Sequence, residues 1–418
     1  MTKLAVCRIP FLAIVMAGQA ASKWVTPACS TNHSTAELPF CDADLPRDAR
    51  AWDLISRLNL TEKVSLLTAG RAWVERLGVH SLEGNECLHG LFNRGNNIES
   101  NGTVLPYAID GGVTVFPQSI GMGATFNRSL LWHMGDVIST EAVAKRNEHR
   151  RRGAAEQDWP FYLTCWMPVI NIARDPRWGR TPETYGEDPL LTRELAVQAV
   201  QGMQGDDPRY LKVSAAPKHF TVYDGPESAQ PGAPAGRMGF DAVVPPEDLD
   251  QTWLDHWQAV VQNSGVHKLG GVMCSYSALD GVPMCGNRRM LTDKLRTEWG
   301  HAGWVVSDCG AISNIATQHH YVNTTVEAAA LALTAGCDIQ CDSAFGSLPQ
   351  AIAGGLALEA DVDTALYRSL IQQFQLGVFD ALDLNPYSRF GMELVDSAAH
   401  RQLAREAAQQ SAVLLSNV

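Results

Sequence analysis

The chain has 418 residues, of which 45% are hydrophobic and 19% are charged, and its formal net charge at pH 7 is −12. A chain of this length can bury one large α/β core or two smaller ones. Acids and bases are spread along it without a basic block, which argues against a nucleic acid or an anionic membrane surface as partner. A neutral substrate fits this balance at least as well as a charged one.

The N-terminus has the pattern of a targeting segment. Lys3 and Arg8 precede the apolar run 9-IPFLAIVMAGQAA-21, which ends in small residues suited to cleavage near Ala20. The run is too short to span a membrane, and a buried N-terminal helix is the alternative. The sequence therefore predicts a signal peptide at 1–20 and a secreted protein. Glycosylation is favoured by five Asn-x-Ser/Thr sequons, at Asn32, Asn59, Asn101, Asn127 and Asn323.

The cysteines suit an oxidising compartment. One of the ten lies in the leader, so nine remain, an odd number. Local spacing predicts the pairs Cys29 with Cys41, Cys274 with Cys285, and Cys337 with Cys341. This leaves over Cys87, Cys165 and Cys309. No Cys-x-x-Cys spacing occurs, so we expect no structural zinc site.

Strand and helix patterns alternate after an N-terminal entry segment at 21–46. Helical spacing begins at 48–70. Apolar runs predict strands at 112–117, 163–170, 213–220, 240–244, 270–277, 303–308 and 336–341. Longer periodic patterns predict helices at 127–149, 187–203, 246–263, 288–300, 324–336 and 359–377.

Continuous apolar strands that alternate with helices predict a parallel sheet covered on both faces. About seven such units favour a (β/α)8 TIM-type barrel at 47–385 over a doubly wound sheet. No Gly-x-Gly-x-x-Gly follows the first strand and no Walker-type loop occurs, so we expect no nucleotide cofactor. The segment 386–418 is predicted to be a linker and the first elements of a second domain. Its apolar end, 411-SAVLLSNV-418, predicts that the chain is cut short there.

Polar residues stand where several predicted strands end. Asp308 follows one strand, Lys218 and His219 end another, and Tyr276 ends a third. The run 174-RDPRWGRTPETYGED-188 follows a fourth. Because such positions converge on one face of a parallel barrel, the sequence predicts a site for a neutral, polyhydroxylated ligand there.

Six ordered motifs carry a family resemblance. They are 86-ECLHG-90, 115-VFPQSIGMGATFN-127, 175-DPRWGRTPETYGEDP-189, 217-PKHF-220, 272-VMCSYSALDGVP-283 and 304-WVVSDCGA-311. Across roughly 48–418 the sequence resembles glycoside hydrolase family 3, most closely its β-xylosidase branch. The resemblance implies a retaining mechanism with a covalent glycosyl-enzyme intermediate.

Residue roles follow from the resemblance position by position. Asp308 matches the nucleophile, and we expect nearby cations to hold its pKa down. The positions that match sugar-binding residues are Glu86, Arg180, Lys218, His219 and Tyr276.

Several of these residues also have a structural reading. Asp308 could cap the next helix, His219 could be a core histidine, and Tyr276 could pack in the core. The arginine role is shared by three candidates, Arg174, Arg177 and Arg180, any of which could instead pair with a neighbouring acid.

Cys309 bears on the choice of sugar. β-Glucosidase members carry Trp after the nucleophile, whereas the xylosidase branch carries Cys, which we interpret as part of the wall beside a pentose. A buried thiol without a role is the alternative. The segment 82-LEGNECLHG-90 departs from the branch, because it lacks the Trp residues that usually precede this motif.

The resemblance implies exo-acting, β-xylosidase-like removal of terminal β-linked xylose from xylo-oligosaccharides or xylan, without a metal or organic cofactor. It also implies that the acid/base comes from an α/β-sandwich domain after the barrel, so no acid/base is assigned to this chain. A β-glucosidase or an α-L-arabinofuranosidase of the same family is the first alternative. A non-catalytic sugar-binding fragment is the second.

Overall fold

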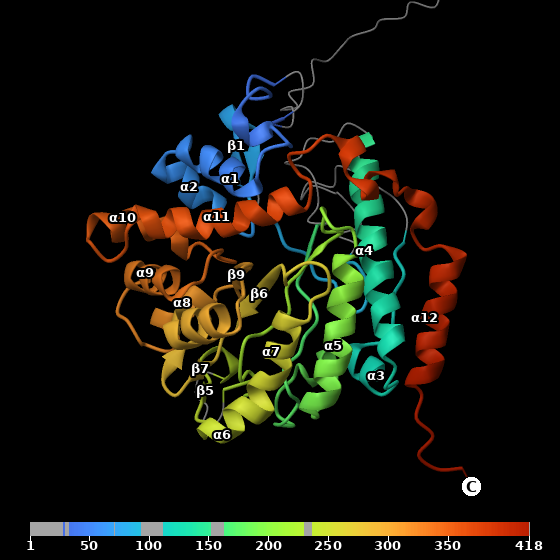
Figure 1. The fold of residues 1–418 in the computed structure, drawn as a ribbon. Coiled ribbons are helices and arrows are strands. Elements are labelled where there is room, and N and C mark those ends of the chain that lie inside the picture. Colours follow the sequence, from blue (N-terminus) through green and yellow to red (C-terminus); the bar gives the residue numbers. More distant parts are fainter. Residues whose placement is uncertain are drawn as a thin grey trace, which may run out of the picture.

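The computed structural model describes residues 28–29, 33–70, 72–92, 112–151, 163–229 and 236–417. The predicted signal peptide and the sequons at Asn32 and Asn101 lie outside these residues. The described part is a mixed α/β structure in which helices flank short, mostly parallel strands (Figure 1).

The strands are β1 (Trp73–Val74), β2 (Val79–His80), β3 (Thr164–Cys165), β4 (Ser214–Ala215), β5 (Asp241–Ala242), β6 (Gly271–Cys274), β7 (Ala278–Leu279), β8 (Val282–Pro283) and β9 (Trp304–Ser307). The α-helices are α1 (Arg47–Ser56), α2 (Leu60–Leu66), α3 (Ser119–Gly123), α4 (Arg128–Arg151), α5 (Pro189–Gln204), α6 (Pro246–Asp248), α7 (Asp255–Gln262), α8 (Ala311–Thr317), α9 (Thr325–Ala335), α10 (Leu348–Ala353), α11 (Glu359–Gln375) and α12 (Ala398–Ser411). Helical segments with wider turns cover Leu249–Leu254 and Arg289–Glu298.

Parallel pairing joins segments that lie far apart in the sequence. The series begins at Asn85, which bridges to β3, and β3 pairs with β4. The segment that continues β4 reaches Phe220, which bridges to β6, and β6 pairs with β9. From β9 the series passes to residues 339–340 and then to Thr68. In the longest pairing, β6 lies in register with β9 from Gly271 against Trp304 to Cys274 against Ser307. Because these segments are parallel, the residues that follow their carboxyl ends lie at one edge. The described pairings do not close the series into a ring.

The helix predictions from 127 onward agree with the structure to within a few residues. The strand predicted at 336–341 is reduced to isolated parallel bridges at Ile339 and Gln340, and one strand prediction is wrong altogether. The segment 112–117 forms no strand in the described structure. Its polar groups bond elsewhere: the Thr114 amide donates to Glu141 Oε2 at 2.8 Å, and the Phe116 amide donates to the His89 carbonyl at 2.7 Å. The backbone amides of this segment thus donate to a side chain and to a loop carbonyl, and not to a neighbouring strand.

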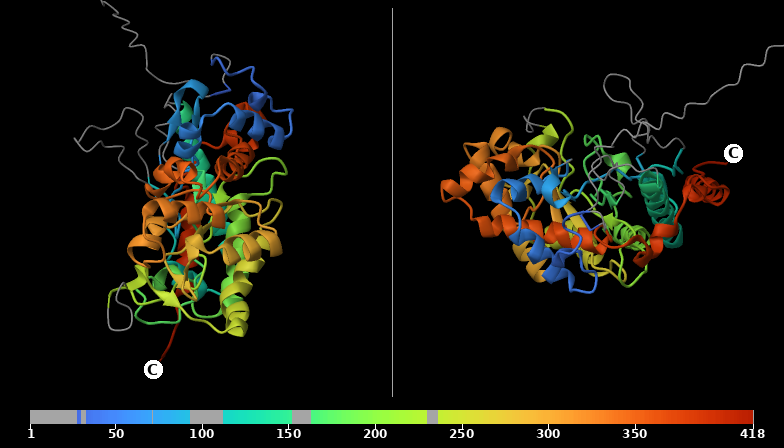
Figure 2. Two further views of the ribbon diagram at one scale, coloured as in Figure 1. Left: turned by 90° about the vertical axis from the view of Figure 1, so that its left-hand side faces the viewer. Right: turned by 90° about the horizontal axis from the view of Figure 1, so that it is seen from above.

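Close helix packing builds the core beside the strands. A Cβ on Gly202 of α5 would lie 2.0 Å from the Trp132 carbonyl oxygen of α4, so only glycine permits this approach (Figure 1). On the other side of α4, α12 lies at the outer edge of the molecule (Figure 2). There His400 Nδ1 lies 2.8 Å from the buried carboxylate of Glu141. In the described ranges, every helix is too short or too polar to cross a membrane.

Candidate active site

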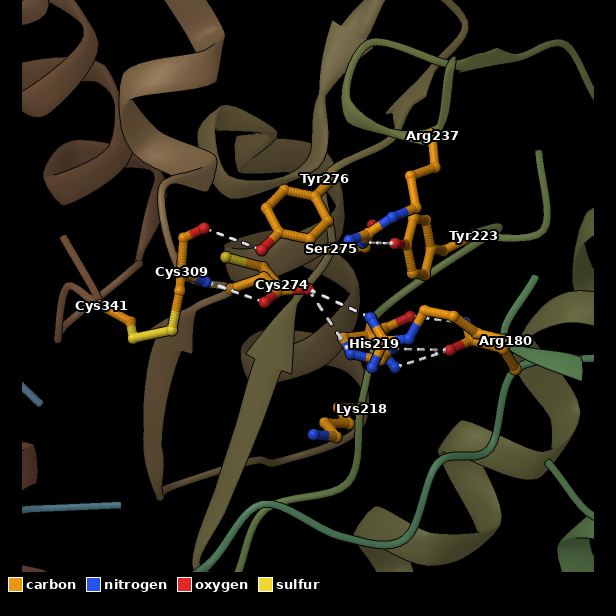
Figure 3. A network of polar contacts seen from close by, with 12 residues as sticks. Arg180, Lys218, His219, Tyr223, Arg237, Cys274, Ser275, Tyr276, Cys309 and Cys341 are labelled. Carbon is orange, nitrogen blue, oxygen red and sulfur yellow. Dashed lines mark hydrogen bonds and ion pairs between the residues drawn. A yellow bond between two sulfur atoms is a disulfide. The ribbon is translucent and has the colours of Figure 1, made fainter. Parts of the chain in front are cut away.

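Asp308 follows β9 and lies at the centre of a network of polar contacts, with Arg180 and His219 as neighbours. Figure 3 shows part of this network, with Arg180, His219 and Tyr276 labelled. The preceding Trp304, Val305 and Val306 are buried, which fixes the strand, and Asp308 itself is only 7% exposed. The Cys309 amide donates to Asp308 Oδ1 at 2.8 Å. Gly310 then adopts a φ of 88°, where glycine is favoured, and α8 begins directly after it. The backbone therefore holds one carboxylate oxygen and leaves the other free.

The free oxygen, Asp308 Oδ2, faces an unpaired acceptor on His219. The amide of Asn171 is oriented unambiguously, because its Oδ1 accepts from the His219 amide and its Nδ2 donates to the His219 carbonyl. His219 Nδ1 must therefore donate to Asn171 Oδ1, at 3.0 Å. Nε2 of the neutral ring is left with a lone pair, 3.5 Å from Asp308 Oδ2.

These two acceptors have no hydrogen-bond donor among the described residues. Burial, with the charges of Arg180 and Lys218, lowers the pKa of His219 well below 6.5, so the ring stays neutral. Two acceptors without a donor between them suit a ligand that supplies hydroxyl groups. The reading of His219 as a satisfied core histidine does not fit its free nitrogen.

The sequence led us to expect a lowered pKa for Asp308, and this direction of the pKa shift is wrong. Burial raises the pKa of this carboxyl above 3.8, although the positive charges of Arg180 and Lys218 oppose the rise. The nearest guanidinium nitrogen, Arg180 Nη1, is 3.9 Å from Asp308 Oδ2, which is too far for a hydrogen bond. The loss of hydration of the carboxylate thus raises its pKa by more than the charges of Arg180 and Lys218 lower it.

Asp308→Asn is expected to stabilise the fold by about 1–2 kcal/mol at pH 7, because it removes a poorly compensated buried charge. A carboxyl whose pKa is raised in the folded state favours folding when protonated, and this contribution is lost as the pH rises through the folded-state pKa. The gain should therefore disappear below about pH 4. Chemical unfolding of both proteins at pH 3.5 and pH 7 measures it, and an equal or lower stability of the variant at pH 7 would contradict the assignment.

Glu86 and Lys218 form the second part of the network. Glu86 follows Asn85, which bridges to Cys165, and Lys218 bridges to Val169. The Lys218 ammonium nitrogen lies 2.7 Å from both carboxylate oxygens of Glu86. The Lys218 side chain is 2% exposed and that of Glu86 is 44% exposed, so the buried cation holds an accessible carboxylate. This arrangement presents acceptor oxygens to solvent in a fixed position.

Arg180 serves both as a brace and as a member of the site. Its Nε and Nη2 donate to the two oxygens of Glu183 at 2.9 and 2.8 Å, while its Nη1 turns toward Asp308. Arg177 instead pairs with Asp175 near the surface. Among the three candidate arginines, the structure thus brings Arg180 to Asp308.

Tyr276, Tyr223 and Arg237 form the remaining side of the network (Figure 3). The Tyr276 hydroxyl donates to the Cys309 carbonyl at 2.7 Å. The Tyr223 ring lies 5.0 Å from His219 and 5.9 Å from Tyr276, between ring centroids. Arg237 donates to the Tyr223 hydroxyl. The sequence prediction missed Tyr223 and Arg237, although Tyr223 shares with Tyr276 the signal of a polar aromatic residue just past an apolar run.

The cysteine prediction needs correction beside the site. The pairs Cys29–Cys41 and Cys274–Cys285 are confirmed. The predicted pair Cys337–Cys341 is wrong, because Cys341 pairs with Cys309, which the prediction had left unpaired. Cys87 pairs with Cys165, and Cys337 is a buried free thiol. The wall next to Asp308 is therefore a disulfide instead of a thiol, and it ties the residue after the nucleophile candidate to the next segment of the parallel series.

Replacing Cys309 and Cys341 by Ser is expected to lower the free energy of unfolding by about 2–4 kcal/mol, because the bridge closes a long loop in the unfolded chain. The separation of these cysteines is 32 residues. Guanidinium unfolding measures the loss, with Cys337→Ala as a control that leaves the bridge intact. A loss no larger than that of the control would show that the bridge contributes little.

The described residues contain no group of three or more His, Cys, Asp or Glu side chains that could hold a metal ion. The arrangement offers instead a buried carboxylate at a strand end, the positive charges of Arg180 and Lys218 near it, and unpaired acceptors for hydroxyl groups. A carboxylate placed in this way can act as a nucleophile toward the anomeric carbon of a bound sugar.

Comparison with known proteins places the chain in a family. Residues 101–370, more than half of the chain, match the glycosyl hydrolase family 3 N terminal domain. The chain belongs to glycosyl hydrolase family 3. This membership is the one that the six sequence motifs predicted.

Relatives in family 3 match almost the whole chain. A β-xylosidase/α-L-arabinofuranosidase 2 from Medicago sativa subsp. varia is 39% identical over 392 residues, covering 92% of this chain and 48% of the relative. A xylan 1,4-β-xylosidase from Xylanibacter ruminicola is 38% identical over 389 residues, covering 92% of this chain and 42% of the relative. A solved GH3 exo-β-xylosidase in complex with a xylobiose aziridine probe gives a TM-score of 0.79 at 29% identity, covering 93% of this chain and 47% of that chain. The chain spans about half the length of these relatives.

Proposed function

We propose that the chain carries the nucleophile and the sugar-binding pocket of a retaining, exo-acting β-xylosidase. Asp308 attacks the anomeric carbon of a terminal β-linked xylose, and a covalent glycosyl-enzyme forms as the leaving oxygen departs. The observation that carries this proposal is the buried Asp308 carboxylate, whose Oδ2 is unpaired beside the free Nε2 of His219.

The surrounding residues have separate roles in this proposal. Arg180 and Lys218 stabilise the Asp308 carboxylate electrostatically, and His219 and Glu86 accept hydrogen bonds from sugar hydroxyls. Tyr276 fixes the backbone of Cys309, whose amide holds Asp308 Oδ1. The acid/base stays a prediction for a domain that follows the barrel.

Xylose is the favoured sugar on two grounds, both of which rest on similarity to the xylosidase branch. The names of the most similar relatives include xylosidase activity. The Cys309–Cys341 disulfide also lies directly after Asp308, at the position where the xylosidase branch carries Cys and β-glucosidase members carry Trp. A second candidate is α-L-arabinofuranosidase activity, which the name of the Medicago relative also includes.

The proposal extends to the complete fold and to the cellular location of the protein. We infer that the parallel series from Asn85 to Thr68 is part of a (β/α)8 barrel at 47–385, followed by a linker at 386–418. Four disulfides in the described residues support secretion through an oxidising compartment. The exposed sequons at Asn59 and Asn323 could accept glycans there.

The test uses sugars that do not need a general acid. The 2,4-dinitrophenyl 2-deoxy-2-fluoro glycosides of β-xylose and β-glucose carry a good leaving group and trap the glycosyl-enzyme. Intact-protein mass spectrometry should show one xylosyl group per chain, formed at least about tenfold faster than the glucosyl adduct. Faster labelling by the glucoside would overturn the xylose preference, and no labelling by either sugar would overturn the assignment of an active glycosidase site.

A further inference from the structure

A cavity of about 590 Å³ lies beside the Asp308 site but does not include it. The described residues that line it include Val222 and Asp224, whereas Tyr223 between them contacts His219 of the Asp308 network. This backbone segment thus lies between the cavity and the Asp308 network. Neither Asp308 nor His219 nor Arg180 is among the residues that line the cavity.

Asp224 is a buried carboxylate in the wall of this cavity, and its own backbone amide is a hydrogen-bond donor to it. Its residue is 7% exposed and lines the cavity, and no side chain of the described residues forms a hydrogen bond or ion pair with it. Burial raises the pKa of Asp224 to about 6, although the charge of Arg174 opposes the rise. A buried carboxylate that no described side chain pairs with costs free energy, part of which a ligand with hydroxyl donors would recover.

Arg174 supplies the complementary group. Its guanidinium carbon lies 5.2 Å from the centre of the Trp253 ring, so a cation–π contact holds the side chain. In the described structure it forms no ion pair, unlike Arg177, which is paired with Asp175. Arg174 is exposed and lines the cavity, so its guanidinium donors are accessible to a ligand.

The chemistry of the walls narrows the class of ligand. Asp224 accepts hydrogen bonds and Arg174 donates them, while Phe240 and Trp253 add apolar surface. A divalent cation does not fit, because the described residues hold no cluster of three ligating side chains and Arg174 would repel it. An anion would be repelled by Asp224. A neutral sugar offers hydroxyl donors, oxygen acceptors and an apolar C–H face together.

We propose that this cavity is a second saccharide-binding site, which takes a neutral mono- or disaccharide between Asp224 and Arg174. It is distinct from the sugar position at Asp308, from which the segment carrying Tyr223 separates it. The volume lies within the range of small-ligand pockets. The choice of xylobiose as probe rests on the proposed function, and cellobiose serves as a second neutral disaccharide.

The test observes Trp253 directly. The full chain is labelled with 5-fluorotryptophan, and its ¹⁹F signal for Trp253 is assigned with Trp253→Phe. Titration with xylobiose and with cellobiose should move this signal saturably for at least one of them. Asp224→Asn and Arg174→Gln should each raise the half-saturation concentration about tenfold, because each removes a charged hydrogen-bond partner. Arg289→Gln, an exposed arginine outside the cavity, is the matched control.

Asp308→Asn keeps the two proposals separate. The Trp253 titration should be unchanged in this variant, because the second site does not use Asp308. A Trp253 signal that neither sugar moves would overturn the second site, as would equal titrations of the wild type and both cavity variants. Loss of the Trp253 response in Asp308→Asn alone would also overturn it, since the response would then come from the Asp308 site. Covalent labelling tests the proposed function independently of all these results.

Discussion

Asp308→Asn is expected to slow covalent labelling by the 2-fluoro xyloside by at least about 10³-fold, because an amide cannot replace the carboxylate that forms the glycosyl bond. The side chain keeps its size, and its buried surroundings disfavour a charge in any case. The variant should therefore fold at least as well as the wild type while losing reactivity. The rate of adduct formation by mass spectrometry is the measurement.

A matched control separates chemistry from general damage. Asp293→Asn makes the same replacement at an exposed position and should label within about twofold of the wild type. If Asp308→Asn labels as fast as this control, Asp308 is not the nucleophile.

Arg180→Lys is expected to lower the labelling rate about 10²-fold, although the charge is kept. A lysine cannot donate to both oxygens of Glu183 and also turn toward Asp308, as the three guanidinium nitrogens do. The charge that opposes the burial of Asp308 would then lose its fixed position. Labelling rates measured over a range of xyloside concentrations distinguish weaker binding from slower bond formation.

Arg177→Lys is the control for this change. Arg177 lies three residues earlier, and its partner is Asp175, outside the Asp308 network. Labelling by this variant should stay within about twofold of the wild type. Equal losses in the two variants would assign Arg180 a general structural role instead of one at the site.

Local patterns in the sequence predicted much of the fold. The periodic segments at 127–149 and 359–377 became α4 and α11, because helix formation depends on neighbours in sequence. The apolar run at 112–117 misled because its partners are the side chain of Glu141 and the carbonyl of His89. Such contacts are set by tertiary structure, which no local pattern encodes.

The cysteines show the same limit close to the site. Short spacing favoured Cys337 with Cys341, but Val306 bridges to Ile339, so the end of β9 lies beside residue 341. Cys309 therefore lies within bonding reach of Cys341, while Cys337 is buried among core residues. Which strands are neighbours decides the pairing, and sequence separation does not reveal it.

The candidate site was predictable where it follows strand ends. Asp308, Lys218, His219 and Tyr276 were placed by position and by the motifs, and the structure brings them together with Arg180 and Glu86. Arg237 could not be found in this way, since it lies after the Pro- and Gly-rich loop and reaches the site through Tyr223. The lone pair on His219 was also beyond prediction, because it depends on the orientation of Asn171.

The most direct test of the central claim is to locate the trapped sugar. The wild-type chain is labelled with the 2-fluoro xyloside and digested, and the modified peptide is sequenced by tandem mass spectrometry. The label should lie on Asp308, in the peptide that contains WVVSDCGA. A label on another carboxylate, such as Glu86, or no label at all would contradict the assignment of Asp308 as the nucleophile.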